Sequence, residues 1–229
     1  MIKALAFGLT LAALALCGTT AMAQTNTLTA AEKAAGWKLL FDGKTAAGWR
    51  GFKAAAPDPG WQARDGALSP DPKTSKDIIT KDAFGDFELA FDWKISPKGN
   101  SGVMFHVTEN GDETYWSGPE YQVLDNARGE RPLEQAGSLY ALYAPVAAQP
   151  KSVGEFNQSR IVVKGGKVEH WLNGTKVVEY DMASADFKAR VAASKFKAWP
   201  VFAASPTGHI ALQNHGDAVW YRNIKIRPL

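Results

Sequence analysis

Short runs of alternating apolar and polar residues, separated by turn dipeptides, constrain the fold of this chain more than any other feature. The longest run is Phe87–Ile95, FELAFDWKI, in which every second residue from Phe87 onward is apolar. Three of the four residues between them are charged. Because side chains alternate between the two faces of a β-strand, this run predicts a strand with one buried face.

Turn dipeptides recur throughout the chain and define further strands. They are Asp42-Gly43, Asp65-Gly66, Asn110-Gly111, Gly165-Gly166 and Asn173-Gly174. The last two separate runs 160–164, 167–172 and 175–180, which predicts a three-stranded meander. Runs 209–213 and 219–226 predict two more strands, and 183–197 is a short helix or an irregular insertion. Many short strands with frequent turns indicate an all-β antiparallel sandwich or barrel.

The N-terminal segment has the pattern of a secretory signal peptide. A charged start is followed by an almost wholly apolar run over residues 4–16 and by Ala21-Met22-Ala23, an A-x-A cleavage site. We therefore expect a signal peptide over 1–23, a polar lead-in over 24–35, one domain over 36–229, and a periplasmic or secreted protein. A membrane span needs about 20 apolar residues, so no stable membrane insertion is expected.

Composition excludes some partners and leaves others open. The chain has 229 residues, 45% of them hydrophobic, and a formal net charge of +3 from interleaved acidic and basic residues. Because no run of Lys and Arg is present, a nucleic-acid partner is not expected. The only cysteine, Cys17, lies in the predicted signal peptide, so the exported chain has no disulfide. The oligomeric state is not indicated.

Three of the predicted strands carry polar residues on the face opposite their apolar set. In the first strand, Glu120 and Gln122 lie on the face opposite Tyr121 and Val123. In the second, Met104 and His106 lie opposite Val103, Phe105 and Val107. In the third, His209 and Gln213 lie opposite Ile210 and Leu212. If these strands are neighbours in one sheet, their polar side chains form one surface over an apolar core. Such a surface is typical of a saccharide cleft; the alternative is the solvent-facing side of a half-exposed sheet.

Several sequence blocks, in order, resemble one known family. They are Trp37–Thr45 with Gly48-Trp49, Asp86–Leu89, Gly99–Val103, Gly118–Asn126, Gly137–Tyr140, Glu155–Asn157, Trp171–Gly174, Gly208–Gly216 and Tyr221–Ile224. Together they are similar to the 3-keto-disaccharide hydrolase family, long described only as a domain of unknown function. Two positions depart from the family pattern: His106 stands where Arg is frequent, and Asn214 replaces the Asp of a Gln-Asp-His-Gly block.

The resemblance implies a fold and an activity. The fold is an antiparallel jelly-roll β-sandwich of the concanavalin A-like type with a concave face. The activity is cleavage of 3-keto-glycosides or 3-keto-disaccharides by C2 proton abstraction and β-elimination, after which water can add. An alternative is a non-catalytic carbohydrate-binding module on the same sandwich. A conventional glycosidase needs a second well-placed carboxylate, which the sequence does not identify.

The proposed chemistry needs a base near C2, a proton donor for the leaving group and groups that bind the enolate or sugar hydroxyls. We assign Glu120 as the base, His215 as the acid or its partner, and His106 to hydrogen bonding or shared acid–base work. Predicted substrate-binding residues are Asn100, Trp116, Gln122, Asp125, Tyr140, Asn157, Trp171, Gln213 and Arg222. Structural roles are the alternative for several of them: a turn residue at His215, an arginine closing the sandwich at Arg222, and a core residue at Trp171.

A divalent metal is an open alternative for this site. Glu120, Asp125, His106 and His215 can hold one if they converge, but no compact ligand spacing predicts it. No cofactor is therefore assigned, and the expected partner is a saccharide or a 3-keto-saccharide.

Overall fold

Two antiparallel sheets form the protein. The computed structural model describes residues 25–129 and 131–229, so the predicted signal peptide lies outside the described residues. The smaller sheet has the order β2 (Trp49–Gly51), β5 (Ile78–Thr80), β12 (His209–Leu212), β7 (Asn100–Val107) and β8 (Glu120–Leu124). The strands that carry Glu120, Asn100 and His209 are therefore neighbours, as the clustering of their polar residues requires.

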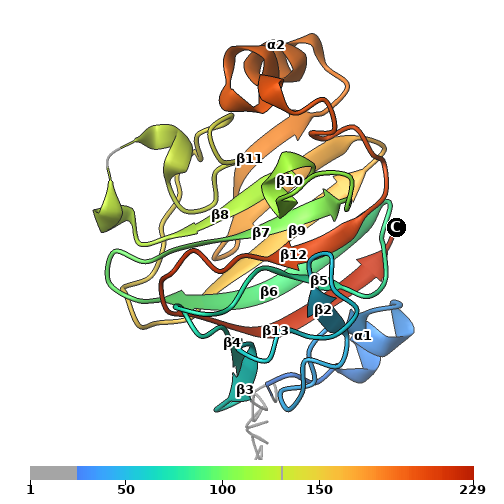
Figure 1. Cartoon of the computed structure of the whole chain (residues 1–229), viewed down its shortest axis with the longest axis vertical. Coiled ribbons are helices and arrows are strands. Elements are labelled where there is room, and N and C mark those ends of the chain that lie inside the picture. The colour runs from blue at the N-terminus through green and yellow to red at the C-terminus, as the bar shows by residue number, and fades with distance from the viewer. Residues whose placement is uncertain (1–24, 130) are drawn as a thin grey trace, which may run out of the picture.

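The larger sheet has eight strands. Its order is β11 (Thr175–Asp181), β10 (Lys167–Leu172), β9 (Asn157–Lys164), β6 (Phe87–Ile95), β13 (Val219–Pro228), β4 (Ala67–Ser69) and β3 (Gln62–Arg64), and β1 (Lys38–Leu39) also pairs with β13. The predicted meander is confirmed, because β9, β10 and β11 are consecutive antiparallel neighbours joined at the two predicted turns. Figure 1 views both layers together, with the strands of one sheet overlapping those of the other.

The core lies between the two sheets. The alternating apolar residues of β6, from Phe87 to Ile95, are buried as predicted, and they join one cluster with Val103, Tyr121 and Leu212 of the smaller sheet. Hydrogen bonds inside this core also cross between the sheets: the hydroxyl of Ser159 in β9 pairs with the hydroxyl of Tyr121 in β8 at 2.7 Å. The predicted all-β, jelly-roll sandwich is confirmed by this architecture.

Helices are short and lie at the ends of the molecule. α1 (Ala30–Ala34) falls in the predicted lead-in, where Thr29 and Glu32 form a capping box. α2 (Ala185–Ala193) falls in the predicted insertion, on the long connection from β11 to β12. Figure 1 shows them at opposite ends. The described residues also form the 3₁₀ turns η1 (Thr114–Trp116), η2 (Asn126–Arg128), η3 (Pro132–Glu134) and η4 (Lys195–Ala198). No helix in residues 25–129 or 131–229 is long and apolar enough to cross a membrane.

A β-bulge in β7 interrupts the alternation that the sequence predicts. His209 and Ala211 lie two positions apart in β12, but their partners Val107 and Met104 lie three apart in β7. β7 therefore carries one extra residue, and His106 adopts a left-handed backbone with φ of 51°. A bulge of this kind moves every later side chain of the strand to the other face.

Because of the bulge, the predicted directions of two side chains of β7, His106 and Val107, are wrong. The ring of His106 turns into the core, where it packs edge-on against Phe87 and Phe105. Its Nε2 pairs with the backbone carbonyl of Gly85 at 2.8 Å, and desolvation lowers the pKa of the imidazole. Val107, predicted to face the core, instead packs with Met104 on the outer side of the sheet.

The bulge depends on a glycine at position 208. A Cβ at Gly208 would lie 2.3 Å from the carbonyl carbon of His106 and 2.6 Å from its oxygen, so the backbone itself would have to move. We expect Gly208→Ala to lower the free energy of unfolding by about 2 kcal/mol or more in urea denaturation. Gly129→Ala, where a Cβ meets nothing within 4 Å, is the control and should change it by less than about 0.5 kcal/mol. Equal stability of the two variants would contradict this account.

Candidate active site

The outer face of the smaller sheet carries a row of buried cross-strand neighbours. Ile79 pairs with Ala211, Ala211 with Met104, and Met104 with Glu120. These three apolar residues form a cluster with Val107 that is separate from the main core, and Tyr115 packs against it. Glu120 therefore stands at the end of an apolar floor.

The Glu120 carboxylate lies in a strongly desolvated position. It is only 6% exposed, and a Cβ at Gly102 on the neighbouring strand would lie 2.1 Å from its Oε1, so the carboxylate occupies the space above that glycine. No group in the described residues donates a hydrogen bond to it. Desolvation raises the pKa of Glu120 to about 8; the negative charge of Asp77 adds to this rise and the positive charge of Lys195 opposes it.

Glu120 lies in a pocket of about 400 Å³, called here the outer-face pocket. Its lining residues are Asn100, Tyr115, Glu120, Gln122, Tyr140, Lys195, Trp199, Gln213 and His215. Six of the predicted site residues thus come together: Asn100, Glu120, Gln122, Tyr140, Gln213 and His215.

Two glutamines give the outer-face pocket an excess of hydrogen-bond acceptors. The Oε1 atoms of Gln122 and Gln213 are buried and have no partner among the described residues. The Nε2 of Gln122 donates to the amide oxygen of Asn100 at 3.0 Å, which fixes its orientation. Because unpaired buried acceptors are costly, this arrangement favours a ligand that brings hydroxyl donors.

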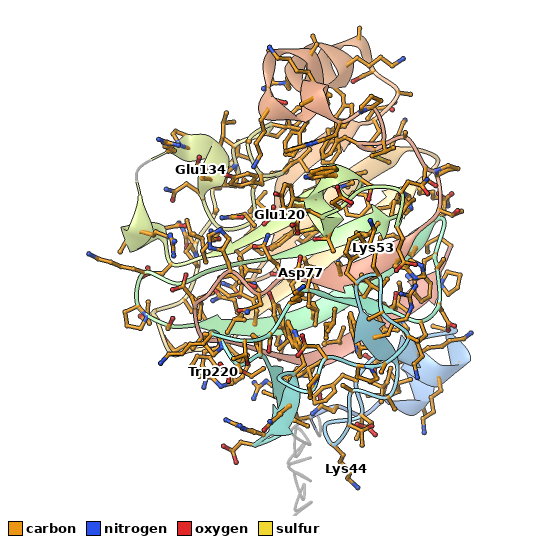
Figure 2. All side chains as sticks on the ribbon, viewed as in Figure 1. Lys44, Lys53, Asp77, Glu120, Glu134 and Trp220 are labelled. Atoms are coloured by element: carbon orange, nitrogen blue, oxygen red, sulfur yellow. The ribbon has the colours of Figure 1, made fainter. Side chains whose placement is uncertain are left out.

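Asp77 ties together two loops at the edge of the site. Its carboxylate accepts hydrogen bonds from the hydroxyl of Thr114, in the turn that holds Tyr115, and from the backbone N–H of Asn214 at 2.9 Å. Asn214 precedes His215, an exposed residue of the pocket rim. Burial raises the pKa of Asp77 to about 6. Figure 2 labels Asp77 and Glu120, which both project near the middle of the sandwich.

Three predicted residues on the smaller sheet or its loops lie outside the outer-face pocket. His106 is turned into the core by the bulge. Trp116 stacks on the pocket residue Trp199, with ring centroids 5.6 Å apart, but does not itself line the pocket. Asp125 accepts hydrogen bonds from the backbone N–H groups of Lys98 at 2.7 Å and Ala127 at 3.1 Å, which is a structural role in a turn.

Three others belong to the larger sheet and cannot reach Glu120. The oxygen of Asn157 in β9 accepts from the backbone N–H of Lys151 at 2.7 Å. Trp171 in β10 stacks under the guanidinium of Arg160 at 4.1 Å. Arg222 in β13 pairs with Asp92 at 3.3 Å. The alternation of side chains along a strand identifies the residues that point away from the core. It does not show whether they lie on the outer face of the smaller sheet or of the larger sheet.

Sequence reasoning missed three residues of the outer-face pocket. Tyr115 comes from η1, and Lys195 and Trp199 come from the connection after α2. Neither segment has strand periodicity, so alternation gives no signal for them. The aromatic and basic run Lys195–Trp199, KFKAW, within an otherwise helical insertion is the one available indication.

The metal ligand set considered from the sequence does not assemble. Of Glu120, Asp125, His106 and His215, only Glu120 and His215 line the outer-face pocket. Across the described parts of the chain, no three His, Cys, Asp or Glu side chains group as metal ligands.

The raised pKa of Glu120 predicts a stability effect that depends on pH. Between its ordinary value of 4.5 and about 8, the folded state binds the proton more tightly than the unfolded state, so stability falls as pH rises through this range. We expect Glu120→Gln to be more stable than the wild type at pH 9 by roughly 2 to 4 kcal/mol, and the difference to disappear near pH 5.

Urea denaturation of both proteins at pH 5 and pH 9 measures this difference. Glu155→Gln, which neutralises an exposed carboxylate, is the matched control and should show no comparable dependence on pH. A Glu120→Gln variant with unchanged or lower stability at pH 9 would show that the carboxylate is adequately solvated.

Comparison with known proteins places the chain in a family. Residues 36–227 match the family described as the 3-keto-alpha-glucoside-1,2-lyase-like domain. A 3-keto-disaccharide hydrolase of Bacteroides thetaiotaomicron is 33% identical over 228 residues, covering 85% of this chain and 79% of the relative.

Solved structures agree with this placement. A "putative glycosyl hydrolase" from Parabacteroides distasonis has a TM-score of 0.84 and 36% identity, covering 90% of this chain and 100% of the other. A Bacillus subtilis protein with a galectin-like fold has a TM-score of 0.51 and 12% identity over 90% of this chain and 94% of the other, which is a likeness of fold alone. The chain therefore belongs to the family of 3-keto-disaccharide hydrolases and 3-keto-alpha-glucoside-1,2-lyase-like domains that its sequence blocks resemble.

Proposed function

We propose that this protein cleaves the glycosidic bond of 3-keto-glycosides or 3-keto-disaccharides, with Glu120 as the base that removes the proton from C2. Family membership and the name of the Bacteroides thetaiotaomicron relative support a carbohydrate-active function. The observation that carries the mechanism is the desolvated Glu120 carboxylate, which has no hydrogen-bond donor in the described protein and lines a pocket rich in acceptors.

A ketone at C3 makes the C2 proton acidic, because the resulting carbanion is delocalised as an enolate. Glu120 takes the proton; the C2–H electron pair becomes the C2=C3 double bond, and the carbonyl pair moves to oxygen. When the ketone reforms, the C1=C2 double bond forms and the C1–O bond breaks. The leaving oxygen takes a proton, which we assign to His215 at the pocket rim. Addition of water, with oxygen at C1 and a proton at C2, completes a net hydrolysis.

The electrostatics of Glu120 suit proton removal from carbon. A carboxylate with an ordinary pKa is a weak base toward a C–H group, whereas a pKa near the working pH combines basicity with a sufficient ionised fraction. The apolar floor of Ile79, Ala211 and Met104 withholds water from the carboxylate, which raises its pKa. A carbohydrate-binding module gains nothing from such a group, since the carboxylate destabilises the folded protein above its ordinary pKa.

Substrate hydroxyls match the unpaired acceptors of the site. We assign the Oε1 atoms of Gln122 and Gln213 to sugar hydroxyl donors, and Asn100, held by Gln122, to a further polar contact. Tyr140, Tyr115 and Trp199 form the aromatic part of the wall, which suits the apolar face of a sugar ring.

The decisive assay compares a 3-keto-glucoside with its unoxidised parent. We expect release of the aglycone from the keto compound alone, since only that compound has an acidic C2 proton. Glu120→Gln should reduce turnover by at least 10³-fold while leaving the fold intact, and Glu155→Gln should retain wild-type activity. Binding of either sugar without turnover would support the binding-module alternative, and release from the parent would indicate a conventional glycosidase.

The pKa of Glu120 also predicts the pH profile. Only the ionised carboxylate can accept the C2 proton, so kcat/KM should fall about tenfold per pH unit below the pKa of the free enzyme. With the pKa raised to about 8, this acidic limb should lie near pH 8 rather than near pH 4.5. Measurement of kcat/KM from pH 5 to pH 10 tests it. A limb near pH 4.5 would mean that a solvated carboxylate is the base.

A further inference from the structure

One cation lines the outer-face pocket without a carboxylate partner. Lys195, in η4, has its ammonium nitrogen 4.5 Å from the ring centroid of Tyr140 and 5.5 Å from that of Tyr115. No Asp or Glu of the described chain lies within ion-pair distance of it. Among the described residues that line the pocket, Lys195 is the one lysine or arginine.

The backbone that carries Lys195 is firmly anchored. Ser194 is the C-cap of α2, and its hydroxyl accepts a hydrogen bond from the N–H of Phe196 at 3.1 Å. The ring of Phe196 is buried and stacks on Phe202 with ring centroids 4.0 Å apart. Lys195 is therefore held between a capped helix end and a core anchor, although its own side chain remains exposed.

The surroundings of Lys195 orient its charge without neutralising it. Aromatic rings attract an ammonium group through their quadrupole but carry no net charge. The full positive charge of Lys195 thus remains available to an anionic oxygen in the pocket. The same charge acts on Glu120, whose pKa it lowers against the larger effect of desolvation.

We propose that Lys195 is a further catalytic residue, whose ammonium group binds the C3 oxygen of the substrate and stabilises the negative charge that this oxygen gains when Glu120 removes the C2 proton. The inference rests on the proposed function. In the ground state the C3 oxygen is a neutral carbonyl, and in the enolate it carries the electron pair released from the C=O bond. Because the interaction strengthens as that charge develops, it lowers the barrier more than it tightens substrate binding.

Three variants test this role. Lys195→Met keeps the length of the side chain and removes its charge, and Lys195→Arg keeps the charge. Lys197→Met is the matched control, since Lys197 is exposed on the same turn and does not line the pocket. On a 3-keto-glucoside, Lys195→Met should lower kcat by about 10² to 10³-fold with a smaller change in KM. Lys195→Arg should recover at least a tenth of wild-type kcat, and Lys197→Met should match the wild type.

The pH profile separates catalysis from a structural role. Removal of the cation should move the acidic limb of kcat/KM to higher pH in Lys195→Met, because the positive charge that lowers the pKa of Glu120 is lost. Lys195→Met with kcat within threefold of the wild type, or with an unmoved acidic limb, would overturn the inference and leave the proposed function standing. Wild-type protein that leaves the keto compound intact would overturn the proposed function, and the inference with it.

Discussion

Desolvation of one carboxylate is the constraint on which the rest of this site depends. Glu120 ends a buried row across the outer face of the smaller sheet, with Met104 as its direct neighbour. Within residues 25–129 and 131–229, no group donates a hydrogen bond to its oxygens. Such a group opposes folding near neutral pH, and the core between the two sheets must offset its cost. An ionisable group kept in this environment is better explained by reactivity than by stability.

Different parts of the fold supply the floor and the walls of the outer-face pocket. Regular strands provide Glu120 and Gln122, whose positions follow from sheet geometry. The walls come from loops, with Tyr115 on a 3₁₀ turn and His215 after β12. Asp77 bonds to both of these segments and so couples two walls that are distant in the sequence. In many enzymes a rigid scaffold holds the reactive groups, and the surrounding loops contact the substrate.

The sequence predicts those parts of the site that obey a regular period. Alternation places Glu120 and Gln122 together, since β8 is uninterrupted. It fails at His106, because an extra residue in β7 turns that side chain inward, and bulges leave no reliable signal in a single sequence. It misplaces Arg222, because alternation gives the face of a strand relative to its own sheet but not which of two sheets the strand joins. Lys195 lies in a segment without any period, where only tertiary packing determines what faces the pocket.

The space above Gly102, which the Glu120 carboxylate fills, has a consequence beyond local packing. The carboxylate can remain against the sheet only where position 102 carries a hydrogen atom in place of a methyl group. A larger residue there would push the oxygens outward into solvent, where hydration would restore the ordinary acidity of a glutamic acid. The basicity of one residue is thus set by the smallness of another on the adjacent strand, so the two positions are expected to change together during divergence of the family.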